Sequence, residues 1–459
     1  MGSAQSDTQR LIDVRLRSPS LLMRRRIIRL AIPNIVSNIT VPLLALVDVG
    51  LAGHTATGGT SIGAVAVASG AVSTLYWLFG FLRMGTTGFV ARCFGAKEWQ
   101  KVNRHLAQGI TMALLSGLLL LLMMPLVLLF VRFMAQRELV LGSAAVEYAR
   151  LALCGAPAAM LLYVFNGWFI GMQNTRVPML GAITINLLNI SLSYLFVHVF
   201  KMGVRGLALG TIIAQYSGMI FFSVMARYRY WEVLCRFRVA DLWHLSGGRS
   251  YFTTHRDLFV RSALLSAVTL FFTYASTSYG EEIVAANTLL LQLFNLFSYF
   301  MDGFAYAGEA LTGRYLGMRR KEALQMLVRQ LFSVAVPLTL GATLLYFLFP
   351  EPFLSFLSDS PQVVETALRW SPFVAFVPLV GFAAFLWDGI FVGATYAKGL
   401  LWSMLLASAC FFSIYWGTRS LWGVASLWLA FDVYLAVRGL VQWLLWHRHF
   451  ATLLQESNL

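Results

Sequence analysis

The sequence predicts an all-α integral membrane protein with twelve transmembrane helices in two similar six-helix bundles. Three observations lead to this fold class: the composition, the recurrence of long apolar segments, and an internal repeat. The chain has 459 residues, of which 58% are hydrophobic and 12% charged, and its mean hydropathy is +0.70. A soluble domain of this size has about twice that charged fraction, so this composition excludes a soluble protein.

Apolar segments long enough to cross a bilayer recur from one end of the chain to the other. Crossing the hydrocarbon core takes about 20 apolar residues in a helix. The first segment, 27–53, is interrupted by Pro33 and Pro42. The twelve predicted spans cover residues 27–53, 60–92, 104–131, 143–171, 177–200, 204–228, 257–279, 283–316, 323–349, 364–394, 399–417 and 421–447.

The net charge of +15 follows the predicted turns. Arginines 24–26 precede the first span, and basic residues gather at every second turn after it, most densely in 92–104, 227–256 and 319–321. Cytoplasmic loops of membrane proteins carry such an excess of Lys and Arg. The pattern therefore predicts an inner-membrane protein with both termini in the cytoplasm, and the charge does not indicate a nucleic-acid partner.

The two halves of the chain resemble each other at one constant offset. The segment 78–102 is similar to 299–323, and 165–175 is similar to 387–397. The matching pairs, each 222 residues apart, are Arg92/Arg314, Gly95/Gly317, Gly167/Gly389 and Gly171/Gly393. Six spans return the chain to the same side, so the two halves should be related by an axis along the membrane normal. The predicted organisation is an N-terminal tail (1–23), a first lobe (24–228), a linker (229–256), a second lobe (257–449) and a C-terminal tail (450–459).

Both halves contain a G-x-x-x-G pattern, at Gly167/Gly171 and at Gly389/Gly393. This spacing puts two glycines on one helix face and lets a second backbone approach closely. We interpret these four glycines as helix-packing residues.

No catalytic or metal-binding signature fits its context. The segment G-T-S-I-G at 59–63 matches a nucleophile pattern, but it lies in a turn between two spans and not between a strand and a helix. The four cysteines have no metal or disulfide spacing, and no nucleotide-binding loop is present. We therefore expect no enzyme activity, no cofactor and no metal site, and any active transport should use an ion gradient.

Asp48, near the end of the first span, is the main candidate for ion coupling. A charged carboxylate inside a bilayer costs roughly 2.5–3.5 kcal/mol or more, so such residues usually face a protein interior and bind protons or ions. The alternative interpretation is a helix-end Asp that reaches interfacial water.

Other polar residues fall at membrane depth in both halves. Asn186, Asn189 and Ser193 share one helix face by their spacing, and together with Asp48 they favour a polar pocket over isolated interhelical hydrogen bonds. The first half contains Asp48, Tyr148, Tyr163, Asn166, Asn186, Asn189, Ser193 and Thr211; the second contains a possible polar site at Asp302, Glu309 and Asp388. Arg83 lies deep in the second span and should need a carbonyl, carboxylate or water partner.

Four segments of the chain resemble the DinF-like branch of the multidrug and toxic compound extrusion (MATE) family. They are LVDVGLAGH (46–54), LYWLFGFLRMGTTG (75–88), YFMDGFAYAGEAL (299–311) and DGIFVGAT (388–395). The resemblance implies a V-shaped pair of six-helix lobes that exports cationic or amphipathic compounds against a proton or sodium flow. It also implies that the matching positions Asp48, Asn166, Asn189, Thr211 and Tyr148 form the coupling network of the first lobe.

One position departs from that family's pattern. Family members commonly have Asp where this chain has Ser193, and related sodium-driven exporters have an acid in the seventh span, where 258–279 has none. Since sodium sites usually include a carboxylate, we favour protons as the coupling ion and leave sodium open.

Two alternatives to a proton-driven drug exporter remain. A sodium-coupled exporter is one, and a lipid-linked precursor flippase of the same superfamily is the other. A flippase would need a cationic cavity to bind the pyrophosphate of its substrate, yet basic residues inside the spans are few beyond Arg83 and Arg261. The expected partners are small cationic or amphipathic molecules and the bilayer, with the protein as a monomer.

Overall fold

The computed structural model describes residues 19–53, 58–134, 139–235 and 248–455. Within these ranges the side chains of 41, 43–53, 58–62, 64, 139–141, 248–249 and 450–455 are outside the description. The described part of the chain is helical throughout, without a strand, which confirms the all-α fold class. Helices satisfy their own backbone hydrogen bonds, as a segment inside lipid must.

The first lobe is built from helices that follow the predicted spans, several of them broken in two. The second predicted span is broken at Phe79–Gly80, and the fourth bends by 49° between α7 and α8, at Gly155. The helices are α2 (Pro19–Gly53), α3 (Gly58–Leu78), α4 (Phe81–Ala96), α5 (Trp99–Leu122), α6 (Met124–Met134), α7 (Leu139–Cys154), α8 (Ala156–Gly171), α9 (Arg176–Tyr194) with the π-helical turn η1 (Leu195–Val199), α10 (Val204–Arg229) and the short α11 (Trp231–Leu234).

The second lobe has longer, mostly unbroken helices. Prolines lie inside two of them, Pro337 in α14 and Pro372 and Pro378 in α16. The helices are α12 (Gly248–Thr277), α13 (Glu281–Gly317), α14 (Lys321–Leu348), α15 (Pro350–Leu357), α16 (Pro361–Gly393), α17 (Ala397–Trp422) and α18 (Val424–Gln455).

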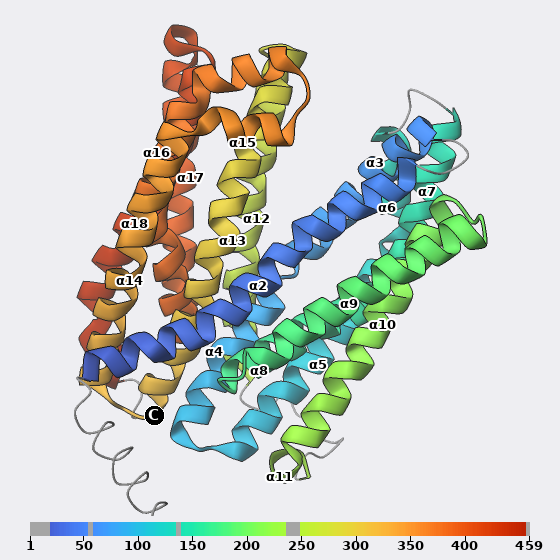
Figure 1. The fold of residues 1–459 in the computed structure, drawn as a ribbon. Helices are drawn as coiled ribbons and strands as arrows, with labels where there is room; N and C mark the ends of the chain where they lie inside the picture. The colour runs from blue at the N-terminus through green and yellow to red at the C-terminus, as the bar shows by residue number, and fades with distance from the viewer. Residues whose placement is uncertain (1–18, 54–57, 135–138, 236–247, 456–459) are drawn as a thin grey trace, which may run out of the picture.

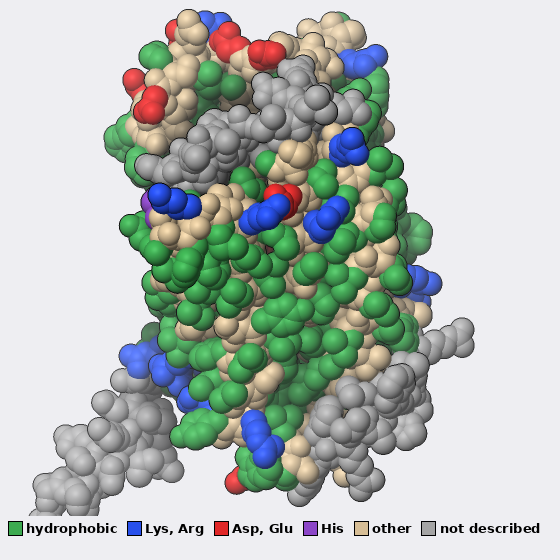
Figure 2. All heavy atoms as spheres, turned by 90° about the vertical axis from the view of Figure 1, so that its right-hand side faces the viewer, with side chains coloured by type: hydrophobic (Ala, Val, Ile, Leu, Met, Phe, Trp, Pro, Cys, Tyr) green, Lys and Arg blue, Asp and Glu red, His purple; other side chains and the backbone are tan. Residues whose placement is uncertain are grey.

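The outer surface is that of a membrane protein. Among the described residues, ten helical segments are long and apolar enough to cross a bilayer, and the bent pair α7 and α8 makes an eleventh. The 35-residue α2 occupies the first predicted span. Figure 2 shows a broad belt of hydrophobic side chains between charged residues at either end. Large apolar side chains in this belt would be costly in water, whereas lipid tails solvate them.

The two lobes form a V. Figure 1 shows them side by side at the end that carries α11, and diverging toward the end that carries α15. α2 runs obliquely between them and packs against α9 on one side and against α13 and α14 on the other. By the distribution of basic turns, the joined end is the predicted cytoplasmic end.

Glycines bring the lobes together at that end. A Cβ added to Gly95 would lie 2.1 Å from the carbonyl oxygen of Arg314, and one added to Gly317 would lie 2.0 Å from the carbonyl oxygen of Arg92. Gly95 and Gly317 are the repeat partners, and so are Arg92 and Arg314. The same contact is therefore made twice between α4 and α13, once from each lobe.

The repeat also recurs inside each lobe and in the turns. A Cβ on Gly167 would lie 2.4 Å from the Arg83 carbonyl oxygen, and one on Gly389 would lie 2.1 Å from that of Ala305, which is 222 residues after Arg83. Lys97 and Arg319, also 222 apart, both adopt left-handed backbone conformations (φ 58° and 56°) after α4 and α13. The two bundles are thus pseudo-symmetric in contacts as well as in sequence.

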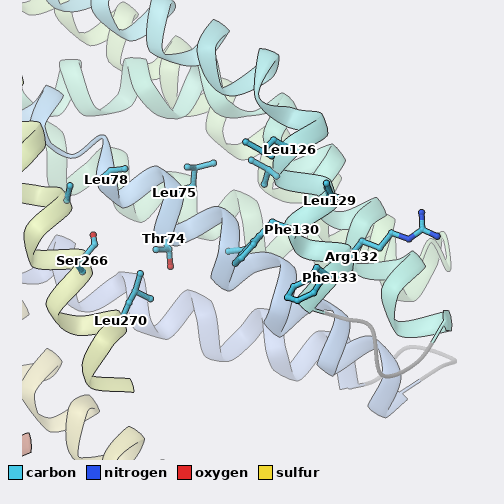
Figure 3. A pocket seen from close by; sticks show the side chains of 14 residues that line it. Thr74, Leu75, Leu78, Leu126, Leu129, Phe130, Arg132, Phe133, Ser266 and Leu270 are labelled. Atoms are coloured by element: carbon cyan, nitrogen blue, oxygen red, sulfur yellow. The ribbon is translucent and has the colours of Figure 1, made fainter. Parts of the chain in front are cut away.

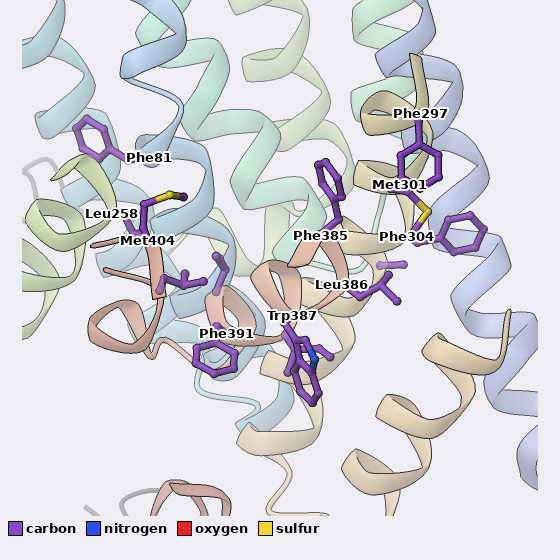
Figure 4. Close-up of a cluster of buried hydrophobic side chains, with 14 of the residues drawn as sticks. Phe81, Leu258, Phe297, Met301, Phe304, Phe385, Leu386, Trp387, Phe391 and Met404 are labelled. Atoms are coloured by element: carbon purple, nitrogen blue, oxygen red, sulfur yellow. The ribbon is translucent and has the colours of Figure 1, made fainter. Parts of the chain in front are cut away.

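Aromatic and aliphatic side chains fill the second lobe. Figure 4 shows part of this core, in which Phe385 and Trp387 of α16 lie between Met404 of α17 on one side and Phe297 and Met301 of α13 on the other. Phe294 and Phe297 meet the ring of Phe385 at centroid distances of 6.4 and 6.2 Å. This packing holds α16 at the centre of the lobe, where its polar residue Asp388 is enclosed.

Candidate functional site

A polar cluster joins α9 to α10 in the first lobe. The Asn189 amide donates to the hydroxyl of Thr211 (2.9 Å), and the Ser193 hydroxyl donates to Asn189 Oδ1 (3.4 Å). The Thr211 hydroxyl donates in turn to the Leu207 carbonyl. Asn189 and Ser193 are buried, and Gly210 leaves the room they need, since a Cβ there would lie 2.5 Å from Ser193 Oγ. The structure therefore brings together three of the predicted coupling residues.

The other three predicted residues of this lobe lie on three further helices. Asp48 is on α2, and its side chain is outside the described part of the chain, so its contacts stay a prediction. Tyr148 is buried on α7, and Asn166 is partly buried on α8. α2 packs against α9, and the Asn186 amide donates to the Thr40 carbonyl (3.3 Å), which ties the two helices together.

In the second lobe, Asp388 is the centre of a buried charge cluster. Its Oδ2 accepts from Arg261 on α12 and from Arg438 on α18 (2.5 Å), and its Oδ1 accepts from the Gln442 amide (2.6 Å). All four residues are buried. Buried charges persist only when paired and hydrogen-bonded, and this carboxylate is bonded at both oxygens.

A second ion pair joins the two lobes. Arg83 Nη1 on α4 lies 3.1 Å from Glu309 Oε2 on α13, and its guanidinium lies 3.9 Å from the centroid of the Tyr306 ring. The partner that Arg83 was expected to need is thus a carboxylate of the other half. Asp302, one turn before Tyr306, lies within electrostatic range of Arg83, Arg261 and Arg438. With all groups ionised, the three arginines balance the carboxylates of Asp302, Glu309 and Asp388.

A cavity of ≈ 1070 Å³ lies where the lobes diverge. Figure 3 shows side chains of α3, α6 and α12 pointing into it, with Arg132 at the far end of α6. The Ser266 hydroxyl is buried and has no hydrogen-bond partner in the part of the chain that the structure describes. The lining residues are mostly apolar: Ala71, Thr74, Leu75, Leu78, Leu126, Val127, Leu129, Phe130, Arg132, Phe133, Ala263, Ser266, Ala267 and Leu270.

Comparison with known proteins gives the family. The MatE family profile matches residues 33–195 and again 258–421, one match in each lobe. This chain belongs to the MatE family.

Individual MatE relatives and structures agree over most of their length. DNA damage-inducible protein F of Escherichia coli is 34% identical over 437 residues, 92% of this chain and 91% of that protein. The probable multidrug resistance protein NorM of Thermotoga maritima is 25% identical over 355 residues, 75% of this chain and 74% of that protein. A crystal structure of a MATE protein in the bent conformation superposes with a TM-score of 0.83 at 19% identity, covering 96% of this chain and all of that one.

Within this MatE fold, sequence reasoning missed two residues of the second-lobe cluster. Arg438 and Gln442 were not singled out, although an Arg and a Gln four residues apart on one face of an apolar span are a visible signal. What the sequence could not show is that α18 presents this face to Asp388. No group of three or more His, Cys, Asp or Glu side chains that could hold a metal occurs among the described residues.

Proposed function

We propose that this protein is a proton-driven antiporter that exports cationic or amphipathic organic compounds. The observation that carries the proposal is the cavity between the two lobes of a MatE-family fold. A cavity bounded by both lobes changes shape when the lobes move, so a molecule bound there can be released on one side of the membrane.

The cavity suits a molecule with a large apolar body. Its ≈ 1070 Å³ is slightly above the range for sites that bind drug-sized ligands, about 300–1,000 Å³. Aliphatic walls bind by burying apolar surface, at about 25 cal/mol per Å², and this attraction requires no fixed orientation. The ring faces of Phe130 and Phe133 offer a planar cation about 0.5–2 kcal/mol each. The few polar groups of the wall, such as Ser266, leave selectivity low.

Proton coupling is assigned to Asp48 and the α9–α10 cluster. Protonation converts a carboxylate from an acceptor into a donor. Asn189 Oδ1 accepts one weak hydrogen bond, from Ser193 at 3.4 Å, and retains capacity to accept another from a neutral Asp48. Pro42 removes a backbone donor from α2 and gives the helix a place to bend. Proton binding would then bend α2 and reshape the cavity, so proton and substrate compete through one residue.

The gradients available are large enough for this work. One pH unit supplies about 1.4 kcal/mol per proton, and 100 mV supplies about 2.3 kcal/mol per charge moved. We place the protein in the inner membrane with both termini in the cytoplasm. In that orientation protons enter the cell through the protein while the substrate leaves it. The E. coli and T. maritima relatives are bacterial proteins, which agrees with this location. We propose that the monomer is the transporting unit, because the two lobes that bound the cavity belong to one chain.

A lipid-linked precursor flippase finds less support. A pyrophosphate needs cationic groups free to bind it. Arg83, Arg261 and Arg438 each bond to a carboxylate of this chain, so they are already neutralised.

The test is efflux of a fluorescent cationic dye from vesicles that contain the purified protein. We expect export under an imposed pH gradient and none under a sodium gradient at equal pH. Export driven by sodium alone would assign the other coupling ion, and no export under either gradient would contradict the proposal.

A further inference from the structure

The Arg83–Glu309 pair differs from the other ion pairs of the described residues because it crosses between the lobes. Arg83 belongs to α4 of the first lobe and Glu309 to α13 of the second. The other pairs found in that part of the chain each join residues of one lobe. Any motion that separates α4 from α13 must therefore break this bond.

The pair also breaks the repeat. Arg83 corresponds to Ala305, and Glu309 corresponds to Thr87, each at the offset of 222. The symmetric counterpart of the Arg83–Glu309 contact would thus be Ala305 with Thr87, which carries no charge. The glycine contacts between the lobes occur twice, whereas the charged contact occurs once, so it is an addition to the packing and not part of it.

The Arg83–Glu309 pair lies at the outer end of the contact between α4 and α13, which closes the predicted cytoplasmic side and is called the cytoplasmic seal below. Toward the cytoplasm, α4 contacts the second lobe at Gly88, where a Cβ would lie 2.3 Å from the Val392 carbonyl oxygen, and at Gly95. Arg83 lies five residues further out on the same helix, near the break at Gly80. The ion pair therefore closes the seal on the side that faces the cavity.

Glu309 has one carboxylate oxygen free to take a proton. Its Oε2 bonds to Arg83, while its buried Oε1 has no hydrogen-bond partner among the described residues. The Thr87 hydroxyl interacts with the Glu309 carboxylate, but it donates its hydrogen to the Arg83 carbonyl (2.9 Å), so its oxygen can accept a hydrogen bond from a protonated Glu309. Buried carboxylate oxygens normally accept hydrogen bonds, so an oxygen without one is a natural place for a proton.

The charged and titratable groups around Glu309 lie on five helices. They are Arg83 on α4, Tyr163 on α8, Arg261 on α12, Tyr306 and Asp302 on α13, and Asp388 on α16. Arg261 is held by Asp388, so Arg83 is the cation that Glu309 controls. If Glu309 became neutral, Arg83 would keep the Tyr306 ring and the nearby charge of Asp302.

We propose that Glu309 is a second proton-binding residue of the transport cycle and that Arg83 is its positioning partner in a latch. With Glu309 ionised, the pair holds α4 against α13 and the cytoplasmic side stays closed. When Glu309 takes a proton at Oε1, its charge falls from −1 to 0 and the ion pair is lost. Arg83 is then held to α13 only by the Tyr306 ring and the longer-range charge of Asp302, so the contact between the lobes is weaker and they can part on the cytoplasmic side. This inference rests on the proposed proton-driven transport and extends it to the second lobe.

The test measures the distance between the outer ends of the lobes. Spin labels are placed at Phe133 on α6 and Phe356 on α15, both exposed, after the four native cysteines are replaced by Ala. Pulsed electron–electron resonance then reports the lobes' separation in nanodiscs between pH 5 and 8. We expect a long distance at high pH and a growing short-distance population as pH falls.

Variants assign that shift to the latch. Glu309→Gln mimics the protonated acid, so we expect the short distance to dominate at every pH; Arg83→Met should do the same. If single variants do not fold, the double variant Arg83→Met/Glu309→Met removes both charges together and leaves no buried charge unpaired. The inference would be overturned if Glu309→Gln, or the double variant, showed the same distances between the spin labels and the same pH dependence as the parent protein.

This outcome is separable from failure of the proposed function. The distance measurement needs no transport, so a protein without proton-driven efflux can still show or lack the latch. Asp48→Asn provides the matched control: it should lose transport but keep a pH-dependent distance that Glu309→Gln abolishes.

Discussion

Asp48 and Asp388 are the predicted carboxylates at membrane depth in the first and second lobes, and of the two the structure describes the contacts of Asp388. Asp388 bonds to Arg261, Arg438 and Gln442, so its charge is neutralised where it lies. In the first lobe, the deep arginine Arg83 is already bonded to Glu309. Asp48 is therefore the better candidate for a carboxylate that gains and loses a proton during transport, whereas Asp388 is better suited to hold helices together.

We predict that Asp48→Asn abolishes proton-driven export while the protein still inserts in the membrane. The amide is fixed in a state like that of the neutral acid, so the residue no longer changes charge during the cycle. Dye efflux from vesicles under a pH gradient measures this, and binding of the dye to purified protein provides the control for folding. Transport equal to the parent's would remove Asp48 as the coupling residue.

The Asp388 cluster gives a prediction about stability. Asp388→Asn removes the carboxylate to which Arg261 and Arg438 both bond, and breaking a buried ion pair by removing one partner costs about 3–5 kcal/mol. Arg438→Met leaves one balanced pair, Arg261 with Asp388. Thermal unfolding in detergent should therefore show a larger decrease in Tm for Asp388→Asn than for Arg438→Met. The reverse order would mean that Asp388 carries a proton in the folded protein.

At the scale of single helices, the sequence predicted which segments cross the membrane better than where they break. Long apolar runs fix the spans, because lipid exposure demands them. The break at Phe79–Gly80 and the 49° bend between α7 and α8 depend on packing between helices, which one sequence does not display. The same holds for the site: Asn189 and Ser193 could be placed on one face by spacing, but the Arg83–Glu309 pair joins residues 226 apart that meet only when the lobes do.

The contact between α4 and α13 depends on small residues at defined positions. We predict that Gly95→Val separates the cytoplasmic ends of these helices, because even a Cβ would lie 2.1 Å from the Arg314 carbonyl oxygen, and backbone cannot yield as a side chain can. Export should fall severely, measured as dye efflux normalised to the amount of inserted protein.

A glycine without such a neighbour provides the control. Gly341 in α14 has no atom within 4 Å of an added Cβ, and Ala is favoured over Gly in a helix by about 1 kcal/mol. Gly341→Ala should therefore leave export unchanged. Equal damage from both variants would show that loss of any helix glycine is harmful and that the α4–α13 contact has no special part.

For the whole molecule, the repeat and the basic turns together predict which end of the V faces the cytoplasm. The lobes meet at the end where α4 and α13 terminate, with Lys97 and Arg319 directly beyond them, and α11 lies at the same end. The opposite end carries α15, with Glu351 in its first turn and no basic residue in its last. By the charge bias of cytoplasmic loops, we predict that the closed end is inside and that the cavity opens outward, the state from which the proposed exporter would release its substrate.

The native Cys235 tests this orientation directly. It is exposed directly after α11, so a membrane-impermeant maleimide should label it in inside-out vesicles and not in intact spheroplasts. Asp359→Cys, in the exposed turn between α15 and α16, should show the opposite pattern once the native cysteines are replaced. Since each lobe has an even number of predicted spans, six, and the linker with Cys235 joins them on one side, both lobes must invert together if either does. Labelling of Cys235 from outside the cell would therefore mean that the whole molecule has the opposite orientation. The cavity would then open to the cytoplasm, and the state shown here would be the one that takes up the substrate.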